Sequence, residues 1–234
     1  MKKLKFTLLT FLVLTLLYPS NTFSQEKVEV EKTSPFSIGT DIVTSYVWRG
    51  TKLSGPALQP YLEYSIAGFT VGSWNSFGFN DQVAEADLYA SYRFDFGLSI
   101  GLTDYYVQGT PYFRYTTDSS SHAFEINLGY EINSFTISGN YITNDASKGL
   151  GNIGGDTYIE LAYGFKYFNV FIGAGNGWHT LESLNTGDEF AVVNIGVSAS
   201  KELKLTESFS LPISGAIVLN PQTETFNVVG TISF

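Results

Sequence analysis

Residues 83–94, VAEADLYASYRF, alternate apolar and polar side chains from Ala84 onward. A β-strand points successive side chains to opposite faces, so alternation with period two separates an apolar face from a polar one. The apolar face would comprise Ala84, Ala86, Leu88, Ala90, Tyr92 and Phe94, and the polar face Glu85, Asp87, Tyr89, Ser91 and Arg93. The stretch therefore predicts a strand whose two sides meet unlike environments.

The same alternation recurs in residues 124–132, 157–165, 191–200 and 209–217. In the third of these, the apolar face would carry Ala191, Val193, Ile195, Val197 and Ala199. Short breaks fall near residues 68, 95, 133–134, 166–167 and 204–206; longer polar breaks span 50–56, 78–82, 108–121, 144–155 and 177–188, and a short one at 220–223 keeps the same phase. Segments on both sides of these breaks number about twelve, each long enough to cross a membrane when tilted.

Composition narrows the class of protein. The chain has no cysteine, a formal charge of -9, and 19 Phe and 15 Tyr among 234 residues. An acidic excess argues against nucleic acid as a partner, because phosphates require a basic surface. After the first 24 residues no continuous apolar run approaches the ~18 residues of a transmembrane helix. A soluble β-sandwich and a membrane β-barrel remain.

Three features favour the barrel over the sandwich. The polar faces are rich in Gly, Ser and Asn, which suits a crowded barrel interior. Aromatic pairs fall near expected strand ends, as in membrane-interface girdles: Tyr46 and Trp48, Tyr61 and Tyr64, Tyr105 and Tyr106, Phe165 and Phe168. Closure also removes edge strands in a chain without disulfides. We predict an all-β, transmembrane antiparallel barrel of about twelve strands, with short periplasmic turns and longer extracellular loops.

The two ends of the chain indicate export to the outer membrane. Residues 1–24 have a basic start, an apolar stretch and small residues before Gln25, which is typical of a secretory signal peptide; the alternative is an uncleaved anchor. Residues 25–35 would be a periplasmic lead-in and 36–234 the barrel. The final FNVVGTISF places Phe226, Val228, Ile232 and the terminal Phe234 on one face, as in the signal that barrel-assembly machinery recognises.

If polar faces point inward, the lumen collects Asp41, Glu63, Glu85, Asp87, Glu125 and Glu160, with Arg93 as the main cation. A low-dielectric wall of one charge sign concentrates counter-ions, so a weak preference for cations is expected. The alternative is that these acids pair with Arg93, Arg49 or Lys52, or bond to tyrosine hydroxyls, and fill a plugged interior.

A family resemblance begins at residues 41–64, DIVTSYVWRGTKLSGPALQPYLEY, in which a strand ends in Tyr-x-Trp-Arg-Gly and a Gly-Pro-Ala loop leads to a second strand. With Gly72-Ser73-Trp74 and residues 85–89 following, this order resembles the TorF-like porin family, also known as the Gcw-chp family. The resemblance implies an outer-membrane barrel of porin type and marks Trp48, Arg49 and Gly50. Lys52-Leu53 departs from the short polar residues common there. The alternative is that Trp48 is a girdle residue and Arg49 a snorkelling anchor.

Candidate chemistry is sparse. The histidines are His122 and His179, and neither has the His-x-Ser spacing that would place both side chains on one strand face. Carboxylates such as Glu85 and Asp87 could suit only Ca²⁺ or Mg²⁺. Residues 149–154 match GxGxxG by letter, but a strand would follow where the fingerprint requires a helix. We expect no enzyme, no cofactor and no metal.

The expected function is passive passage of small solutes through an outer-membrane channel, with weak cation preference. The alternative is a non-conducting barrel that serves structure or adhesion through its extracellular loops. The expected partners are outer-membrane lipid, the barrel-assembly machinery during biogenesis and the solutes themselves, and nucleic acid is not among them.

Overall fold

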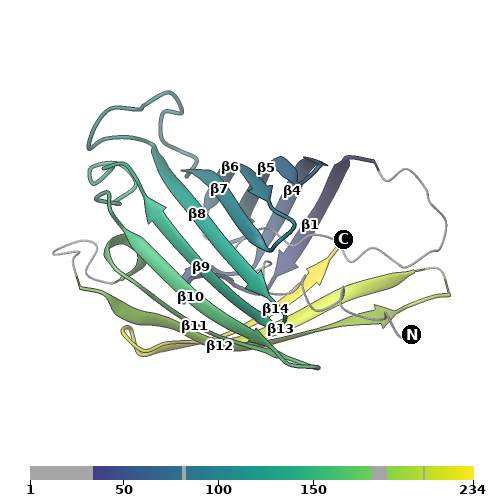
Figure 1. Cartoon of the computed structure of the whole chain (residues 1–234). Coiled ribbons are helices and arrows are strands. Elements are labelled where there is room, and N and C mark those ends of the chain that lie inside the picture. Colours follow the sequence, from purple (N-terminus) through teal and green to yellow (C-terminus); the bar gives the residue numbers. More distant parts are fainter. Residues whose placement is uncertain (1–33, 81–82, 181–188, 208) are drawn as a thin grey trace.

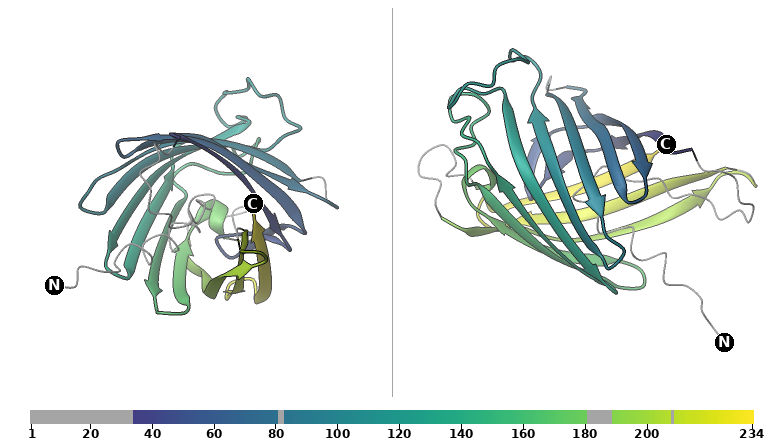
Figure 2. Two further views of the ribbon diagram at one scale, coloured as in Figure 1. Left: turned by 90° about the vertical axis from the view of Figure 1, so that its right-hand side faces the viewer. Right: turned by 45° about the horizontal axis from the view of Figure 1, so that its top comes forward.

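The computed structural model describes residues 34–80, 83–180, 189–207 and 209–234. The expected signal peptide and most of the lead-in lie outside these ranges. Twelve strands close into one antiparallel barrel in the order β1-β14-β13-β12-β11-β10-β9-β8-β7-β6-β5-β4 (Figures 1 and 2). They are β1 (Phe36–Val43), β4 (Ala57–Ile66), β5 (Phe69–Gly78), β6 (Ala84–Arg93), β7 (Leu98–Tyr106), β8 (His122–Ile132), β9 (Phe135–Ile142), β10 (Thr157–Gly164), β11 (Asn169–Gly175), β12 (Ala191–Lys204), β13 (Ser210–Asn220) and β14 (Thr225–Ser233). The prediction of a twelve-stranded barrel is confirmed.

Closure joins the first strand to the last. Asp41 pairs with Ser233 and Val43 with Thr231, while the backbones of Thr40 and Phe234 exchange two hydrogen bonds of 3.2 and 3.0 Å. The terminal residue therefore completes the ladder with β1. Phe226 in β14 and Phe234 directly after it are exposed on the outer face, at 63% and 56%. Recognition of this strand by assembly machinery remains a prediction.

Short turns and long connections alternate around the barrel, as the sequence predicts. At one end, the turn from β4 to β5 consists of Ala67 and Gly68, whose φ angles are 51° and 84°. Two consecutive positive φ angles are the signature of a type I′ turn, whose twist matches that of the flanking strands. The other end carries the long connections, such as residues 107–121. In a transmembrane barrel the short-turn end is periplasmic and the long-loop end extracellular.

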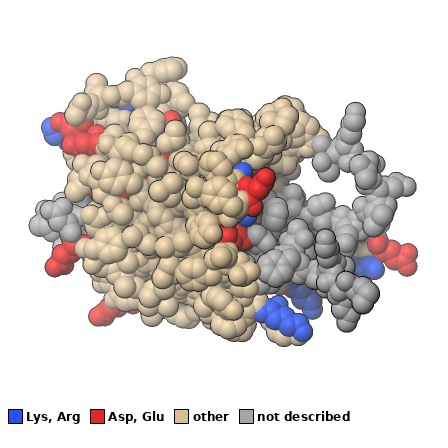
Figure 3. Space-filling model, in the orientation of Figure 1, with Lys and Arg blue, Asp and Glu red and all other residues tan. Residues whose placement is uncertain are grey.

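The barrel is inverted relative to a soluble protein. Outward side chains are apolar and exposed, including Leu62, Leu88, Leu102, Leu128 and Ile159, and inward ones are mostly polar. Charged side chains are sparse over the visible wall (Figure 3). Lipid solvates such an apolar wall. In the closed ladder the backbone N–H and C=O groups of the wall strands find hydrogen-bond partners on neighbouring strands. Among the described residues, no helix has the length and apolar character needed to cross a membrane.

One strand departs from strict alternation. Gly173 on β11 pairs with Asn194, but the next residue, Ala174, pairs with Val192, so Val193 is bulged out of the ladder. Val193 points into the barrel and is fully buried, whereas Val192 is 38% exposed on the outside. The expectation that Ala191 and Val193 lie on the apolar outer face is therefore wrong, because a bulge reverses the side-chain phase of the residues before it.

The largest departure lies between β1 and β4. The expected strand ending in Tyr-x-Trp-Arg-Gly stops at Val43, and β2 (Tyr46–Trp48) and β3 (Thr51–Ser54) form a separate two-stranded sheet. Arg49 and Gly50 make its turn with φ angles of 48° and 84°, again type I′. We call residues 46–54 the lumen hairpin, because its contacts lie on the inner faces of the barrel strands.

Candidate functional site

The lumen hairpin reaches opposite walls of the barrel. Tyr46 packs against Trp74 of β5, with ring centroids 5.4 Å apart, and Trp48 packs against Tyr105 of β7 at 5.7 Å. The side chain between them, Val47, instead packs on a buried cluster of β10, β11 and β13: Ala162, Phe171 and Val218. Successive side chains of β2 therefore engage different sides of the interior, and the hairpin bridges the lumen.

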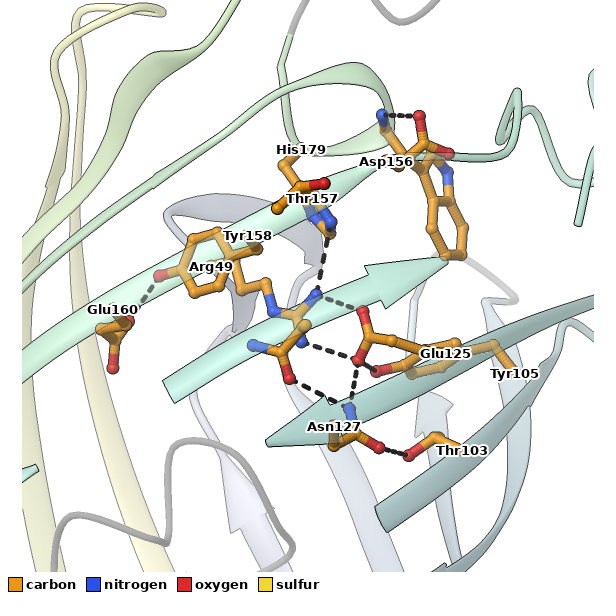
Figure 4. Close-up of polar contacts among 12 residues, drawn as sticks. Arg49, Thr103, Tyr105, Glu125, Asn127, Asp156, Thr157, Tyr158, Glu160 and His179 are labelled. Atoms are coloured by element: carbon orange, nitrogen blue, oxygen red, sulfur yellow. Dashed lines mark hydrogen bonds and ion pairs between the residues drawn. The ribbon is translucent and has the colours of Figure 1, made fainter. Parts of the chain in front are cut away.

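Arg49, at the tip of the lumen hairpin, forms a bidentate ion pair with Glu125 of β8 (Figure 4). Nη1 donates to Oε2 at 2.6 Å and Nη2 donates to Oε1 at 2.8 Å. Glu125 also accepts hydrogen bonds from the Tyr105 hydroxyl, at 2.9 Å, and from Asn127 Nδ2, at 2.6 Å. The two charged side chains are 5% and 0% exposed, so the pair is desolvated and its carboxylate is saturated with donors.

Aromatic rings enclose the guanidinium. Its Cζ lies 4.5 Å from the ring centroid of Trp48 and 4.7 Å from that of Tyr158 on β10, which gives two cation–π contacts. His179 belongs to η2 (Gly177–His179), in the connection that follows β11, and its Nε2 lies 3.4 Å from Arg49 Nη1. Burial, and then the charge of Arg49, lower the pKa of His179 well below its usual value. The imidazole is therefore neutral and accepts from Arg49.

The six acids expected to line the lumen all lie on inward faces, and all are buried, with exposures between 0% and 8%: Asp41, Glu63, Glu85, Asp87, Glu125 and Glu160. Each of the four glutamates bonds to a tyrosine hydroxyl: Tyr89 to Glu63 at 2.5 Å, Tyr46 to Glu85, Tyr105 to Glu125 at 2.9 Å, and Tyr158 to Glu160. This geometry agrees with the alternative in which the acids help to fill the interior.

Arg93 lies apart from this group. It stands at the short-turn end of β6 and bonds Glu131 of β8 at 2.8 Å. Its side chain is 41% exposed. Lys52, on the lumen hairpin, is exposed as well. The cation that the structure brings to the buried acids is therefore Arg49 rather than Arg93.

The aromatic pairs divide between the two faces of the wall. Phe165 and Phe168 are exposed on the outside, as girdle residues would be. Tyr46, Tyr61 and Tyr105 instead point inward and are 7%, 3% and 8% exposed. For these three the girdle assignment is wrong. It is also wrong for Trp48, whose neighbours are interior rings, and Arg49 is a buried partner of Glu125 rather than a snorkelling anchor.

The long-loop half of the lumen is filled, while part of the short-turn half is accessible. Near the long-loop end, Ala57, Val193 and Asn220 are at most 1% exposed. Toward the other end, the inward residues Ser65, Ser200 and Ser214 are exposed. The constriction formed by the lumen hairpin therefore lies toward the long-loop end, and a vestibule lined by small polar residues on β4, β12 and β13 lies toward the short-turn end.

Several buried polar atoms of the barrel interior have no hydrogen-bond partner within the described parts of the chain. They are Arg49 Nε, His179 Nδ1, Ser138 Oγ, Asn140 Nδ2 and Asn194 Oδ1. Asn194 does use its other terminus, since Nδ2 donates to the Tyr158 hydroxyl at 2.9 Å and to Glu160 at 2.8 Å. Unsatisfied buried groups destabilise the arrangement that creates them.

Neither histidine is arranged for nucleophilic catalysis. His122, on the outer side of β8, contacts Asp104 through Nδ1 at 2.8 Å and the carbonyl oxygen of Tyr112 through Nε2 at 2.5 Å. Both ring nitrogens are thus engaged, and Tyr115 stacks on the ring at 4.5 Å. The described residues contain no group of three His, Asp or Glu side chains placed to hold a metal ion. The geometry of His122 is that of an anchor for the 107–121 loop.

The sequence marked Trp48, Arg49 and Gly50 but missed most of their partners. Alternation places Tyr105, Tyr158 and Asn194 on inward faces, yet nothing in the pattern indicates which inward residue meets the hairpin. Gly50 does leave a recognisable requirement: a Cβ there would lie 1.8 Å from the carbonyl oxygen of Val193, and its φ is positive. Glycine is needed at the tip for both reasons.

The chain is similar to several solved structures. A triple mutant of Rh. blastica porin is 14% identical, with a TM-score of 0.37, over 76% of this chain and 55% of the porin. This chain thus spans about half the length of that porin. A second mutant of this porin, with five substitutions, is 14% identical, with a TM-score of 0.42, over 86% of this chain and 74% of the porin. A protein from work on the in-meso crystallization of membrane proteins gives 10% identity and a TM-score of 0.50 over 85% and 83% of the two chains, a likeness of fold alone.

The sequence comparisons fix the family. No curated protein sequence matches this chain. A model of the family described as "Bacterial protein of unknown function (Gcw_chp)" matches residues 29–211, which include the lumen hairpin and strands β1 to β12. Since that model covers most of the chain, the protein belongs to the Gcw_chp family, as its Tyr-x-Trp-Arg-Gly and Gly-Pro-Ala motifs suggest.

Proposed function

We propose that this protein is a porin-type channel of the outer membrane that passes small solutes passively and is narrowed by the lumen hairpin. The observation that carries the proposal is the polar inner wall, which continues from the exposed serines of the vestibule, such as Ser200 and Ser214, to the Arg49 constriction. A barrel that served only as a scaffold could fill this space with apolar side chains. Polar groups line much of the lumen, beside the apolar cluster that Val47 contacts, and they suit water and hydrated solutes.

The charges of the inner wall support a preference for cations. Arg49 neutralises Glu125, and Arg93 neutralises Glu131. The remaining inward acids include Asp41, Glu63, Glu85, Asp87 and Glu160. An excess of one sign on a low-dielectric wall attracts counter-ions of the other. We therefore propose that the channel conducts cations better than anions whenever solutes reach the constriction.

A second candidate is a non-conducting barrel that acts through its extracellular loops. It is favoured by the filling of the long-loop half, where Tyr46, Arg49 and Gly50 of the hairpin are buried, while residues 51–53 are exposed. In this case the lumen hairpin, held by the Arg49–Glu125 pair, would be a permanent plug. Catalysis is not proposed, because the ring nitrogens of His122 face Asp104 and a backbone carbonyl, and His179 faces Arg49.

Conductance in a planar bilayer distinguishes the two. The refolded protein, without residues 1–24, is expected to give discrete current steps, with a cation-selective reversal potential under a KCl gradient. The double variant Glu85→Gln/Asp87→Asn should move that potential toward zero, whereas Asp118→Asn, in an outer loop, should leave it unchanged. A folded barrel that never conducts would support the non-conducting candidate, and steps without selectivity would remove the cation preference.

A further inference from the structure

The lumen hairpin is held differently from the rest of the barrel. In the described structure β2 pairs only with β3, and neither belongs to the closed ladder. The barrel closes without it, since Val43 and Ala57 are directly paired neighbours on β1 and β4. Residues 46–54 could therefore leave the lumen without breaking a strand–strand hydrogen bond of the wall.

Most of the described contacts between the hairpin and the wall are made by side chains, and one of them is a charged pair. The bidentate pair of Arg49 with Glu125 is buried, short and charge-assisted. The other contacts are aromatic packing, such as Trp48 against Trp178 at 5.4 Å, and the close approach of Gly50 to the bulged Val193. The tip of the hairpin is thus fastened to β8 at one strong point.

Some buried polar atoms on the hairpin and beside it lack hydrogen-bond partners. Arg49 Nε on the hairpin, and His179 Nδ1 and Asn194 Oδ1 beside it, are closed off from solvent without a partner in the described structure. A permanent plug would be expected to satisfy these groups or to replace them with apolar ones. If the hairpin withdrew, water would hydrate these three atoms. Hydration of these atoms therefore offsets part of the free energy needed to break the Arg49–Glu125 ion pair.

We propose that the lumen hairpin is a displaceable gate, and that the Arg49–Glu125 pair is the latch that holds it closed. The gate regulates the same constriction through which solutes would pass, so this inference rests on the proposed channel function. With the latch closed the long-loop half of the lumen is sealed. With the latch broken the hairpin moves out, the polar wall is hydrated, and the passage joins the vestibule to the extracellular side.

Single-channel recordings of latch variants test the gate. Arg49→Ala and Glu125→Gln should each raise the fraction of time spent open about tenfold or more, because each removes charge-assisted hydrogen bonds. Glutamine at 125 still accepts from Tyr105 and Asn127, so this variant guards against loss of folding. The exchange Arg49→Glu/Glu125→Arg should return the open fraction toward that of the unmodified protein. Lys52→Ala is the control, since this exposed residue shares the hairpin but not the latch.

A barrel without the hairpin separates the gate from the channel. Replacing residues 44–56 with Asn-Gly joins the paired residues Val43 and Ala57 by a two-residue turn. This variant should conduct continuously, and resistance to SDS without heating would verify that it is folded. If it conducts while the latch variants match the unmodified protein, the gate is overturned and the channel stands. If it folds and never conducts, the channel function fails and the gate fails with it.

Discussion

Arg49 and Glu125 lie 76 residues apart in the chain and meet inside the barrel through hydrogen bonds of 2.6 and 2.8 Å. One partner sits on a hairpin outside the ladder and the other on the wall. The pair therefore connects the only part of the described interior that forms its own sheet to the frame around it. Its geometry yields predictions on conductance and stability.

Arg49→Lys should weaken the latch, although it keeps the charge. A lysine ammonium cannot make the planar two-point contact with Glu125, and it stacks less well on Trp48 and Tyr158. We expect an open fraction between that of the unmodified protein and that of Arg49→Ala, measured by single-channel recording. An open fraction equal to that of the unmodified protein would mean that charge alone, rather than the fork geometry, holds the hairpin.

Gly50→Ala should disturb the closed position of the hairpin by direct overlap. The added Cβ would lie 1.8 Å from the Val193 carbonyl oxygen, on a residue whose φ is +84°. The matched control is Gly109→Ala, because Gly109 also has a positive φ, +103°, but no atom near its Cβ position. We expect a raised open fraction only for Gly50→Ala. Equal effects of the two changes would assign the result to backbone strain instead of overlap.

Leu128→Arg should destabilise the barrel in lipid. Leu128 lies in the middle of β8, points outward and is 50% exposed, so the new charge would face the hydrocarbon. A lipid-facing arginine near the midplane costs roughly 2–4 kcal/mol. Urea unfolding in lipid vesicles, followed by tryptophan fluorescence, measures the change. Phe113→Arg, at an 87% exposed position of the 107–121 loop, should change stability by less than ~0.5 kcal/mol.

Two of the long loops, 107–121 and 143–156, meet at an ion pair with a defined pH dependence. Lys148 Nζ donates to Asp118 Oδ2 at 2.7 Å, and this hydrogen bond lowers the pKa of Asp118 below its ordinary value. A carboxyl whose folded pKa is lowered contributes stability above its unfolded pKa, near 3.9, and loses it as the pH falls through the folded value. We expect NMR titration of Asp118 to give a midpoint below 3.9 that rises in Lys148→Ala. An unchanged midpoint would mean that the loops are not joined by this pair in solution.

Much of the fold could be predicted from the sequence, since a barrel wall needs only local information. The side chains of residues 83–94 must alternate because a strand has two faces, and wall strands that follow one another in the chain are joined by turns or loops visible in the composition. The wrong assignments occur where a strand departs from regular alternation of its side chains. The bulge at Val193 adds one residue to β12 without any change in composition, so alternation assigned the residues before it to the wrong face.

The site could be predicted only in outline. Alternation placed the acids inward, and the family motif marked Trp48, Arg49 and Gly50. The role of these three residues depends on the chain turning inward after Val43, which places the motif inside the barrel. The partners of Arg49 then come from β8, β10 and the connection after β11, three segments that are remote in sequence.

The sequence by itself determined a twelve-stranded barrel with an apolar outside and a polar inside, because those properties follow from side-chain period and from the need to satisfy the backbone in lipid. Only the tertiary structure decided what the polar inside contains. Whether Glu125 faces water or the guanidinium of Arg49 depends on closure of the barrel around the hairpin, which brings charges from distant strands within hydrogen-bond distance of one another.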